Sequence, residues 1–205
     1  MRSRLVLFST IMALLMACEQ TDRPELRYIG DIIEPDGSVT PHEIRPFELV
    51  DQLGRKITNE DLKGNIHLVD FFFTSCPSIC PKVTKQMLRL YDHVEEMDDV
   101  LLISHTIDPK RDSVAVLKLY ADNLSIDHTR WLFLTGDKDE IMDLANEDYF
   151  VAAMESPDAP GGFDHSGKIL LLDKDARIRG FCEGTDPESV DQMMLLIDEL
   201  GKTYE

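Results

Sequence analysis

The sequence predicts an α/β fold in which a central mixed sheet is flanked by helices. Short apolar runs typical of buried strands alternate with segments of helical periodicity, and the chain then closes with a hairpin and a helix. The length of 205 residues is ample for one domain with a hydrophobic core.

The first half of the predicted domain contains a hairpin, a helical turn, a strand and a helix. The continuous apolar run 66–73 is typical of a central strand that is covered on both faces. Val83, Met87 and Leu90 recur at helical spacing in the segment that follows. The expected elements are strands 47–50 and 55–57, a turn of helix at 58–62, strand 66–73 and helix 82–97.

The second half continues the alternation and then changes pattern. Pro187 near the start of the last helical segment suits a first helical turn. The expected elements are strand 100–107, a helix from 112 or 113 to about 123, strand 131–134, a helix from 137 to about 146, an extended edge segment at 149–154, a hairpin of 168–172 with 177–181, and a final helix from 186. Units of βαβ that end in ββα predict a thioredoxin-like fold with an additional amino-terminal hairpin.

Residues 1–17 have the pattern of a signal peptide. Arg2 and Arg4 precede an apolar stretch of about 13 residues, which is short for a membrane-spanning helix. The end of this stretch, Leu-Met-Ala-Cys at 15–18, resembles a bacterial lipobox, which implies cleavage before Cys18 and lipidation of that residue. The alternative is an uncleaved anchor. Both predict an exported, membrane-anchored protein, a lipoprotein in the first case, that faces the periplasm or another extracytoplasmic space.

The remaining chain divides into a tether and a domain. Residues 18–45 are polar with scattered Pro and Gly and are expected to be a tether that becomes ordered near the domain, and residues 46–205 form the domain. The formal net charge of −18 becomes −20 when Arg2 and Arg4 leave with the signal peptide. This charge argues against nucleic acid and anionic lipid head groups as partners and suits steering toward basic surfaces.

Cys76 and Cys80, in the segment FFFTSCPSICP, are the candidate functional cysteines. The end of a strand and the start of a helix place both thiols near the positive end of a helix dipole, where the thiolate forms more readily. Thiolates attack disulfides and also bind soft metals. Two thiolates and an imidazole suit Cu(I) and can hold Cu(II), whereas structural zinc usually takes four protein ligands. Three interpretations of Cys76 and Cys80 remain open: a metal site, a redox pair and a structural disulfide.

His165, in the Gly-rich segment GGFDHSG before a strand, is the candidate third ligand. In a thioredoxin-like layout this loop faces the start of the Cys-bearing helix, and Asp164 beside it is expected to support the imidazole. Cys182 is expected to be a buried small hydrophobe, with an accessory thiol as the alternative. The histidines expected in structural places are His42 in the tether, His67 in a strand, His93 on a solvated helix face, His105 at a sheet end and His128 in a loop.

Four motifs in order, FFFTSCPSICP, TIDPKRDS, WLFLTG and DHSGKILLLD, resemble those of the Sco/SenC family of copper chaperones over about residues 45–200. The resemblance implies copper bound by Cys76, Cys80 and His165. It also implies a role in delivering copper to, or reducing the thiols of, the binuclear copper site of cytochrome c oxidase subunit II. Asp108 matches a family position near the site. The lipobox in place of a transmembrane helix, and Cys182, depart from the family pattern.

Two functions from different classes follow. The first is a membrane-tethered copper metallochaperone whose partners are cytochrome c oxidase subunit II, a thiol reductant and, through the lipid anchor, a membrane. The second is a thiol–disulfide oxidoreductase that acts through Cys76 and Cys80. Its usual motif is CxxC, and CPSIC has one residue more. A peroxidase is disfavoured because the Pro-x-x-x-Thr frame is missing before Cys76.

Overall fold

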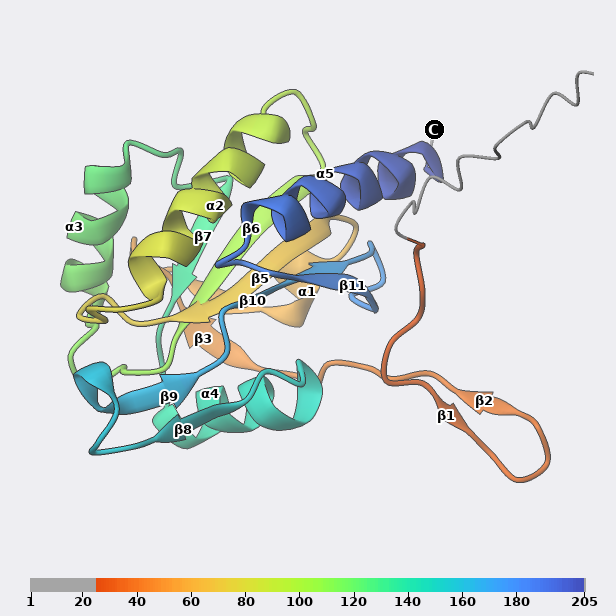
Figure 1. Cartoon of the computed structure of the whole chain (residues 1–205), viewed down its shortest axis with the longest axis horizontal. Coiled ribbons are helices and arrows are strands. Elements are labelled where there is room, and N and C mark those ends of the chain that lie inside the picture. Colours follow the sequence, from red (N-terminus) through yellow and green to blue (C-terminus); the bar gives the residue numbers. More distant parts are fainter. Residues whose placement is uncertain (1–24, 205) are drawn as a thin grey trace, which may run out of the picture.

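A five-stranded mixed sheet forms the centre of the protein in the computed structural model, which describes residues 25–204. The strand order is β11-β10-β5-β6-β7 (Figure 1). The parallel strands are β5 (Ile66–Phe72), β6 (Val100–Thr106) and β7 (Trp131–Leu134). The antiparallel strands are β10 (Lys168–Leu172) and β11 (Ile178–Glu183). The predicted α/β class with a mixed sheet is confirmed.

Three helices cover one face of the sheet: α2 (Cys80–His93), α3 (Val114–Leu124) and α5 (Pro187–Lys202). Figure 1 shows α2 and α5 running beside each other over the strands. The ring of Tyr120 in α3 lies 5.5 Å from the ring of Phe72 in β5, which places α3 on the same face as α2. The chain passes from the carboxyl end of β5 directly to the start of α2. The positive end of the α2 dipole therefore lies beside the carboxyl end of β5.

The opposite side carries α4 (Lys138–Asp143), which continues as the π-helical turn η1 (Leu144–Asp148). A separate two-stranded sheet follows, made of β8 (Ala153–Glu155) and β9 (Phe163–His165), with the short 3-10 turn η2 (Pro160–Gly162) between them. Figure 1 shows α4, β8 and β9 together below the main sheet. This small sheet is absent from the sequence prediction.

The predicted hairpin before the central strand is confirmed. It consists of β3 (Glu48–Val50) and β4 (Lys56–Thr58), which pair antiparallel. The predicted helical turn is α1 (Asn59–Leu62). It begins at a capping box in which the carboxylate of Asp61 accepts the backbone N–H of Thr58 at 2.8 Å.

The helix predicted over 82–97 begins and ends earlier. Pro81 occupies the first turn of α2, where its missing N–H costs nothing, so Cys80 becomes the first helical residue. The helix ends at His93 because Glu95 and Glu96 place negative charge at the negative end of the helix dipole.

The helix predicted to reach about residue 146 is α-helical to Asp143 and continues as a π-helical turn to Asp148. Asn146 uses its side-chain amide to accept the N–H of Ala153 at 3.0 Å and to donate to the carbonyl of the same residue at 2.9 Å. These bonds imitate a neighbouring strand and hold the start of β8 against the π-helical turn. Phe150, with a φ of 54°, interrupts the extended segment predicted at 149–154.

Residues 18–45 are predicted to be a tether that becomes ordered near the domain, and the part that the structure describes, from residue 25 onward, contacts the domain. Residues 32–33 and 39–40 form the small hairpin of β1 (Ile32–Ile33) and β2 (Val39–Thr40). The backbone N–H of Ile29 donates to the carbonyl of Ile178 in β11 at 3.0 Å. The structured chain therefore starts before residue 46, because the free edge of β11 offers backbone partners.

The predicted signal peptide, residues 1–17, and the lipidation site Cys18 lie outside the described residues. Within residues 25–204 no helix has the length and apolar character needed to span a membrane.

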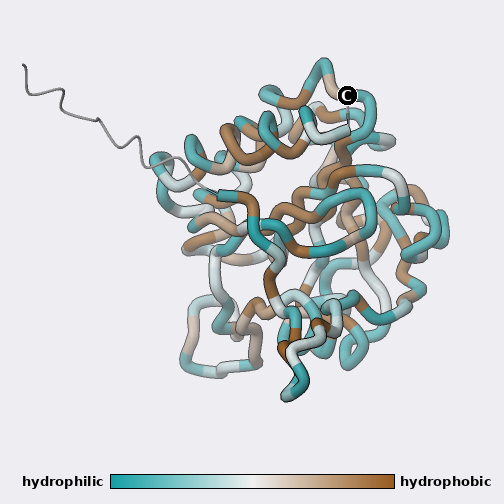
Figure 2. Tube along the Cα trace, turned by 90° about the vertical axis from the view of Figure 1, so that its right-hand side faces the viewer, coloured by the Kyte–Doolittle hydropathy of each residue, from teal (hydrophilic) through white to brown (hydrophobic). Residues whose placement is uncertain are grey.

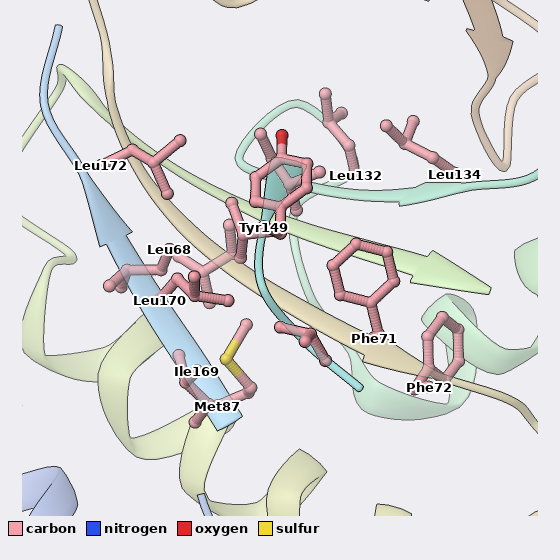
Figure 3. Close-up of a cluster of buried hydrophobic side chains, with 14 of the residues drawn as sticks. Leu68, Phe71, Phe72, Met87, Leu132, Leu134, Tyr149, Ile169, Leu170 and Leu172 are labelled. Carbon is pink, nitrogen blue, oxygen red and sulfur yellow. The ribbon is translucent and has the colours of Figure 1, made fainter. Parts of the chain in front are cut away.

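The hydrophobic core lies between the sheet and the helices. Leu68 of β5, Met87 of α2 and Ile169 of β10 are all fully buried, and Figure 3 shows these elements contributing side chains to one cluster. Each fully buried side chain of this size stabilises the fold by roughly 1.5–3 kcal/mol. Figure 2 shows brown, hydrophobic segments in the interior and teal, hydrophilic segments in the outer turns.

His105 is an unusual member of this core. Its ring stacks on that of Phe71 at 5.0 Å, and neither of its nitrogens has a hydrogen-bond partner among the described residues. Complete burial lowers the pKa of His105 to about 3, because no nearby group compensates for the lost hydration of the cation.

Replacing His105 with Phe should reduce the loss of stability on acidification. The unfolded chain binds a proton near pH 6.5 and the folded chain only near 3, so stability linked to His105 is complete above the first value and falls below it. Between these two pH values, the free energy of unfolding linked to His105 changes by up to about 1.4 kcal/mol per pH unit. Urea unfolding of both proteins at neutral and mildly acidic pH measures this difference. Parallel pH dependences would contradict it.

Candidate metal centre

The structure brings Cys76, Cys80 and His165 together. Their ligand atoms all lie within 4.8 Å of one another, and Cys80 Sγ is 3.5 Å from His165 Nε2. Cys76 lies in the loop after β5, Cys80 begins α2, and His165 ends β9. The histidine was predicted in a loop. It ends a short strand instead, because residues 153–155 pair with 163–165.

The positions of the two thiols follow from the end of β5. The chain turns directly after this buried strand, and the N–H of Cys76 donates to the carbonyl of Phe73 at 3.2 Å. Pro81 then sets the first turn of α2, so that Cys80 sits at the positive end of the helix dipole.

The two thiols differ in acidity. Burial acts to raise the pKa of Cys76, but hydrogen bonds from the backbone N–H groups of Cys80 and Ser78 outweigh it and the pKa is lowered. Burial raises the pKa of Cys80 strongly, and the neighbouring Cys76 thiolate adds to the effect. Cys76 is therefore the thiol that ionises first, and Cys80 holds its proton until a metal or a disulfide replaces it.

His165 is held in an orientation that suits a metal ligand. Its Nδ1 lies 3.2 Å from the carbonyl oxygen of Ser166, so a hydrogen on Nδ1 leaves the lone pair of Nε2 facing the thiols. Burial lowers the pKa of His165, which favours the neutral imidazole that metals bind. Asp164, expected to support the ring, is exposed and makes no hydrogen bond to it; the Ser166 carbonyl has this role.

Asp112 fixes the loop that carries the cysteines, and the sequence prediction missed it. Its buried carboxylate accepts the N–H of Thr74 at 3.0 Å and the hydroxyl of Thr106 at 2.5 Å. The helix that follows is capped by Ser113, whose side chain accepts the N–H of Val116. The sequence did contain a signal for this role of Asp112. The residue follows β6, and because β5 and β6 are parallel, the carboxyl ends of the two strands lie side by side.

Arg111 connects the loop before His165 to the main sheet. Its Nη1 donates to the carboxylate of Asp108 at 2.8 Å and to the carbonyl of Gly161 at 3.2 Å. Gly161 has a φ of +83°, and a Cβ there would lie 2.6 Å from the ring of Phe73. This contact explains why the DPKRD segment lies near the site: Asp108 orients Arg111, and Arg111 holds the histidine-bearing loop.

The other histidines and Cys182 stay outside the site. Backbone carbonyls or carboxylates hydrogen-bond the rings of His42, His67, His93 and His128. His93, predicted to be solvated, is thus paired with Asp198 at 2.9 Å. Cys182 is 3% exposed in β11, and burial raises its pKa to about 12. It fits the predicted buried hydrophobe.

This donor set suits a soft metal ion. Two sulfurs and one imidazole nitrogen provide a three-coordinate site for Cu(I), and no other His, Cys, Asp or Glu of the described chain joins the group as a fourth ligand. The same two thiols can also form and break a disulfide.

Comparison with known proteins decides the family. The sequence model of SCO1/SenC matches residues 35–199. The chain belongs to the SCO1/SenC family. The resemblance that the four sequence motifs predict is therefore confirmed.

Three family members illustrate the similarity. The SCO1 protein homolog of Bacillus subtilis is 32% identical over 155 residues, covering 75% of this chain and 80% of its own. BsSco, a member of the Sco family of cytochrome c oxidase assembly proteins with a disulfide switch, is 29% identical. Its structure matches with a TM-score of 0.68 over 78% of this chain and 94% of its own. Copper-bound ScoI of Bradyrhizobium japonicum is 31% identical with a TM-score of 0.59 and covers 75% and 97%.

Arg111→Ala should loosen the loop that precedes His165. Loss of the bond to Gly161 should speed amide hydrogen exchange of residues 156–162 about fivefold, equivalent to roughly 1 kcal/mol. Lys110→Ala is the matched control, because Lys110 makes no hydrogen bond or ion pair to the described residues. Equal exchange in wild type and Arg111→Ala would contradict the positioning role.

Proposed function

We propose that this SCO1/SenC-family protein is a membrane-tethered copper metallochaperone. The observation that carries the proposal is the convergence of Cys76, Cys80 and His165, whose ligand atoms lie within 4.8 Å of one another. Bradyrhizobium japonicum ScoI, a relative of the same fold, has been solved with copper bound. The proposed cargo is Cu(I), held by two thiolates and the Nε2 of the histidine.

Transfer of the cargo proceeds by ligand exchange. A site with three protein ligands leaves room for an incoming thiolate, which binds copper as one ligand of this chain departs. His165 is the suitable ligand to leave first, since a neutral imidazole binds Cu(I) less strongly than a thiolate does. The proposed acceptor is the binuclear copper site of cytochrome c oxidase subunit II. BsSco, named as a member of a family of oxidase assembly proteins, supports this choice.

A second candidate function is thiol–disulfide exchange at the same acceptor. The opposite pKa shifts of Cys76 and Cys80 favour it, because a reactive thiolate beside a protonated thiol is the arrangement that attacks and then resolves a mixed disulfide. In this reaction the two cysteines become oxidised and the acceptor cysteines become reduced. Both functions require an external thiol reductant in an oxidising, extracytoplasmic space.

The proposed location follows from the amino terminus. Cleavage of residues 1–17 and lipidation of Cys18 would place the domain on the outer side of a membrane. The lipid anchor then takes the place of a transmembrane helix and keeps the copper site near a membrane-bound acceptor.

The purified domain should bind one Cu(I), and Cys76→Ser or Cys80→Ser should each abolish binding. A serine hydroxyl is a poor ligand for Cu(I), and one thiolate with one imidazole does not complete the site. Anaerobic titration against a chromogenic competitor measures the affinity. Cys182→Ser is the matched control and should bind copper as the wild type does. Undiminished copper binding by both site variants would refute the assignment.

His165→Ala should separate the two candidate functions. Imidazole takes part only in the metal complex, so the variant should lose at least tenfold in copper affinity while it forms the Cys76–Cys80 disulfide nearly as well as the wild type. Competition titration and thiol counting after oxidation give the two results. Full copper affinity in the variant would favour the oxidoreductase.

Cys18→Ala should prevent lipidation, so that a diacyl anchor no longer retains the protein at the membrane. The change removes the nucleophile that the lipobox presents for modification. Metabolic labelling with a radioactive fatty acid, followed by fractionation, measures both effects. Equal labelling of wild type and variant would show that residue 18 is not the lipidation site.

A further inference from the structure

A groove between α2 and α3 is the route to the two thiols. Cys76 and Cys80 are only 7% and 3% exposed, and both line this groove, which has a volume of about 330 Å³. His165 lies 3.5 Å from Cys80 on another side, with its ring 5.6 Å from that of Phe73. An incoming sulfur must approach a thiol within bonding distance, and the groove offers an opening that both thiols line.

The walls of the groove are mostly apolar. Leu88 of α2 faces Tyr120 and Leu124 of α3 across it. Val116 lies four residues before Tyr120 on the same side of α3 and is 38% exposed, so it extends the apolar wall outward. Figure 1 shows α2 and α3 as neighbours on this face. A partner segment with an apolar side chain beside its cysteines fits this surface.

The α2 rim of the groove is basic on an acidic protein. No Asp or Glu occurs between Asp70 and Asp92, although the whole chain has a net charge of −18. Lys82 and Lys85 are exposed in the first turns of α2, and neither has an ion-pair partner among residues 25–204. Lys85 lines the groove, and Lys82 adjoins Pro81 of its lining. The charge at this rim is therefore positive, although the net charge of the chain is negative. The net charge alone predicts basic partners, whereas the charge at the rim favours an acidic one.

We propose that this groove, with Lys82 and Lys85 at its rim, is the docking surface for an acidic polypeptide segment that presents its own cysteines. The inference rests on the proposed function, since it specifies the partner with which Cys76 and Cys80 exchange ligands or disulfides. Opposite charges at the rim attract such a segment, while the acidic remainder of the surface repels it. Encounters therefore concentrate where the thiols are accessible.

Thiol–disulfide exchange with synthetic peptides tests the docking surface. Two peptides carry the same intramolecular disulfide, flanked by Glu in one and by Lys in the other. The Cys76 thiolate attacks one peptide sulfur and releases the other as a thiolate. The Cys80 thiolate then attacks the Cys76 sulfur of the mixed disulfide and releases the first peptide sulfur as a thiolate. The protein loses two electrons and two protons, and the peptide gains them. Quenched samples analysed by mass spectrometry give the rates, normalised to each peptide's rate with dithiothreitol.

The Glu peptide should react about tenfold faster than the Lys peptide at low ionic strength, and high salt should reduce this preference. Lys85→Glu should remove most of the preference. Lys202→Glu is the matched control: it makes the same charge change at the carboxyl end of α5, away from the groove, and should keep the preference (Figure 1). Lys82→Glu provides a second rim variant if Lys85→Glu lowers the melting temperature.

Equal rates for the two peptides, a preference for the Lys peptide, or equal effects of Lys85→Glu and Lys202→Glu would overturn the docking surface. The exchange reaction needs no copper, so its outcome is independent of whether the domain binds the metal. Copper binding together with equal peptide rates would reject the docking surface and leave the proposed function standing.

Discussion

The site depends on one long-range contact, in which His165 at the end of β9 meets Cys80 at the start of α2. The two residues are 85 positions apart in the chain, and their ligand atoms lie 3.5 Å from each other. The cysteine side is rigid because β5 is the middle strand of the sheet, paired with β6 and β10. The histidine side belongs to the small two-stranded sheet of β8 and β9, three residues before β10 begins. The hydrogen bond from Arg111 to Gly161 is one of the contacts that position it.

The electrostatics of the site follow from the same architecture. Burial acts to raise the pKa of both thiols. The N–H groups of Cys80 and Ser78 outweigh it at Cys76, whereas the backbone hydrogen bond from Phe73 does not offset the deeper burial of Cys80. A single structural feature, a strand that ends at a helix start, thus yields one reactive and one proton-holding thiol. Either copper or a disulfide replaces the proton on Cys80. This shared requirement links metal binding to the redox state of the pair.

Much of this arrangement could be predicted from the sequence. The apolar run 66–73 and the helical spacing after it identified the central strand, the Cys-bearing turn and α2, because local pattern and burial agree there. The β8–β9 sheet was missed, since each strand has three residues and depends on distant partners such as Asn146. Asp112 was missed for the same reason: its partner Thr74 is 38 residues away. The backbone bonds of Arg27 and Ile29 to β11 were not predicted, because the polar composition of this segment hides them.

X-ray absorption spectroscopy of the Cu(I)-loaded domain tests the central claim most directly. It reports the number and type of atoms bound to copper, which neither affinity nor stoichiometry reveals. The account predicts a three-coordinate ion with two sulfur ligands and one imidazole nitrogen, and a two-coordinate ion with two sulfurs in His165→Ala. An unchanged spectrum in the variant, or two sulfur ligands alone in the wild type, would contradict the contact on which the site depends.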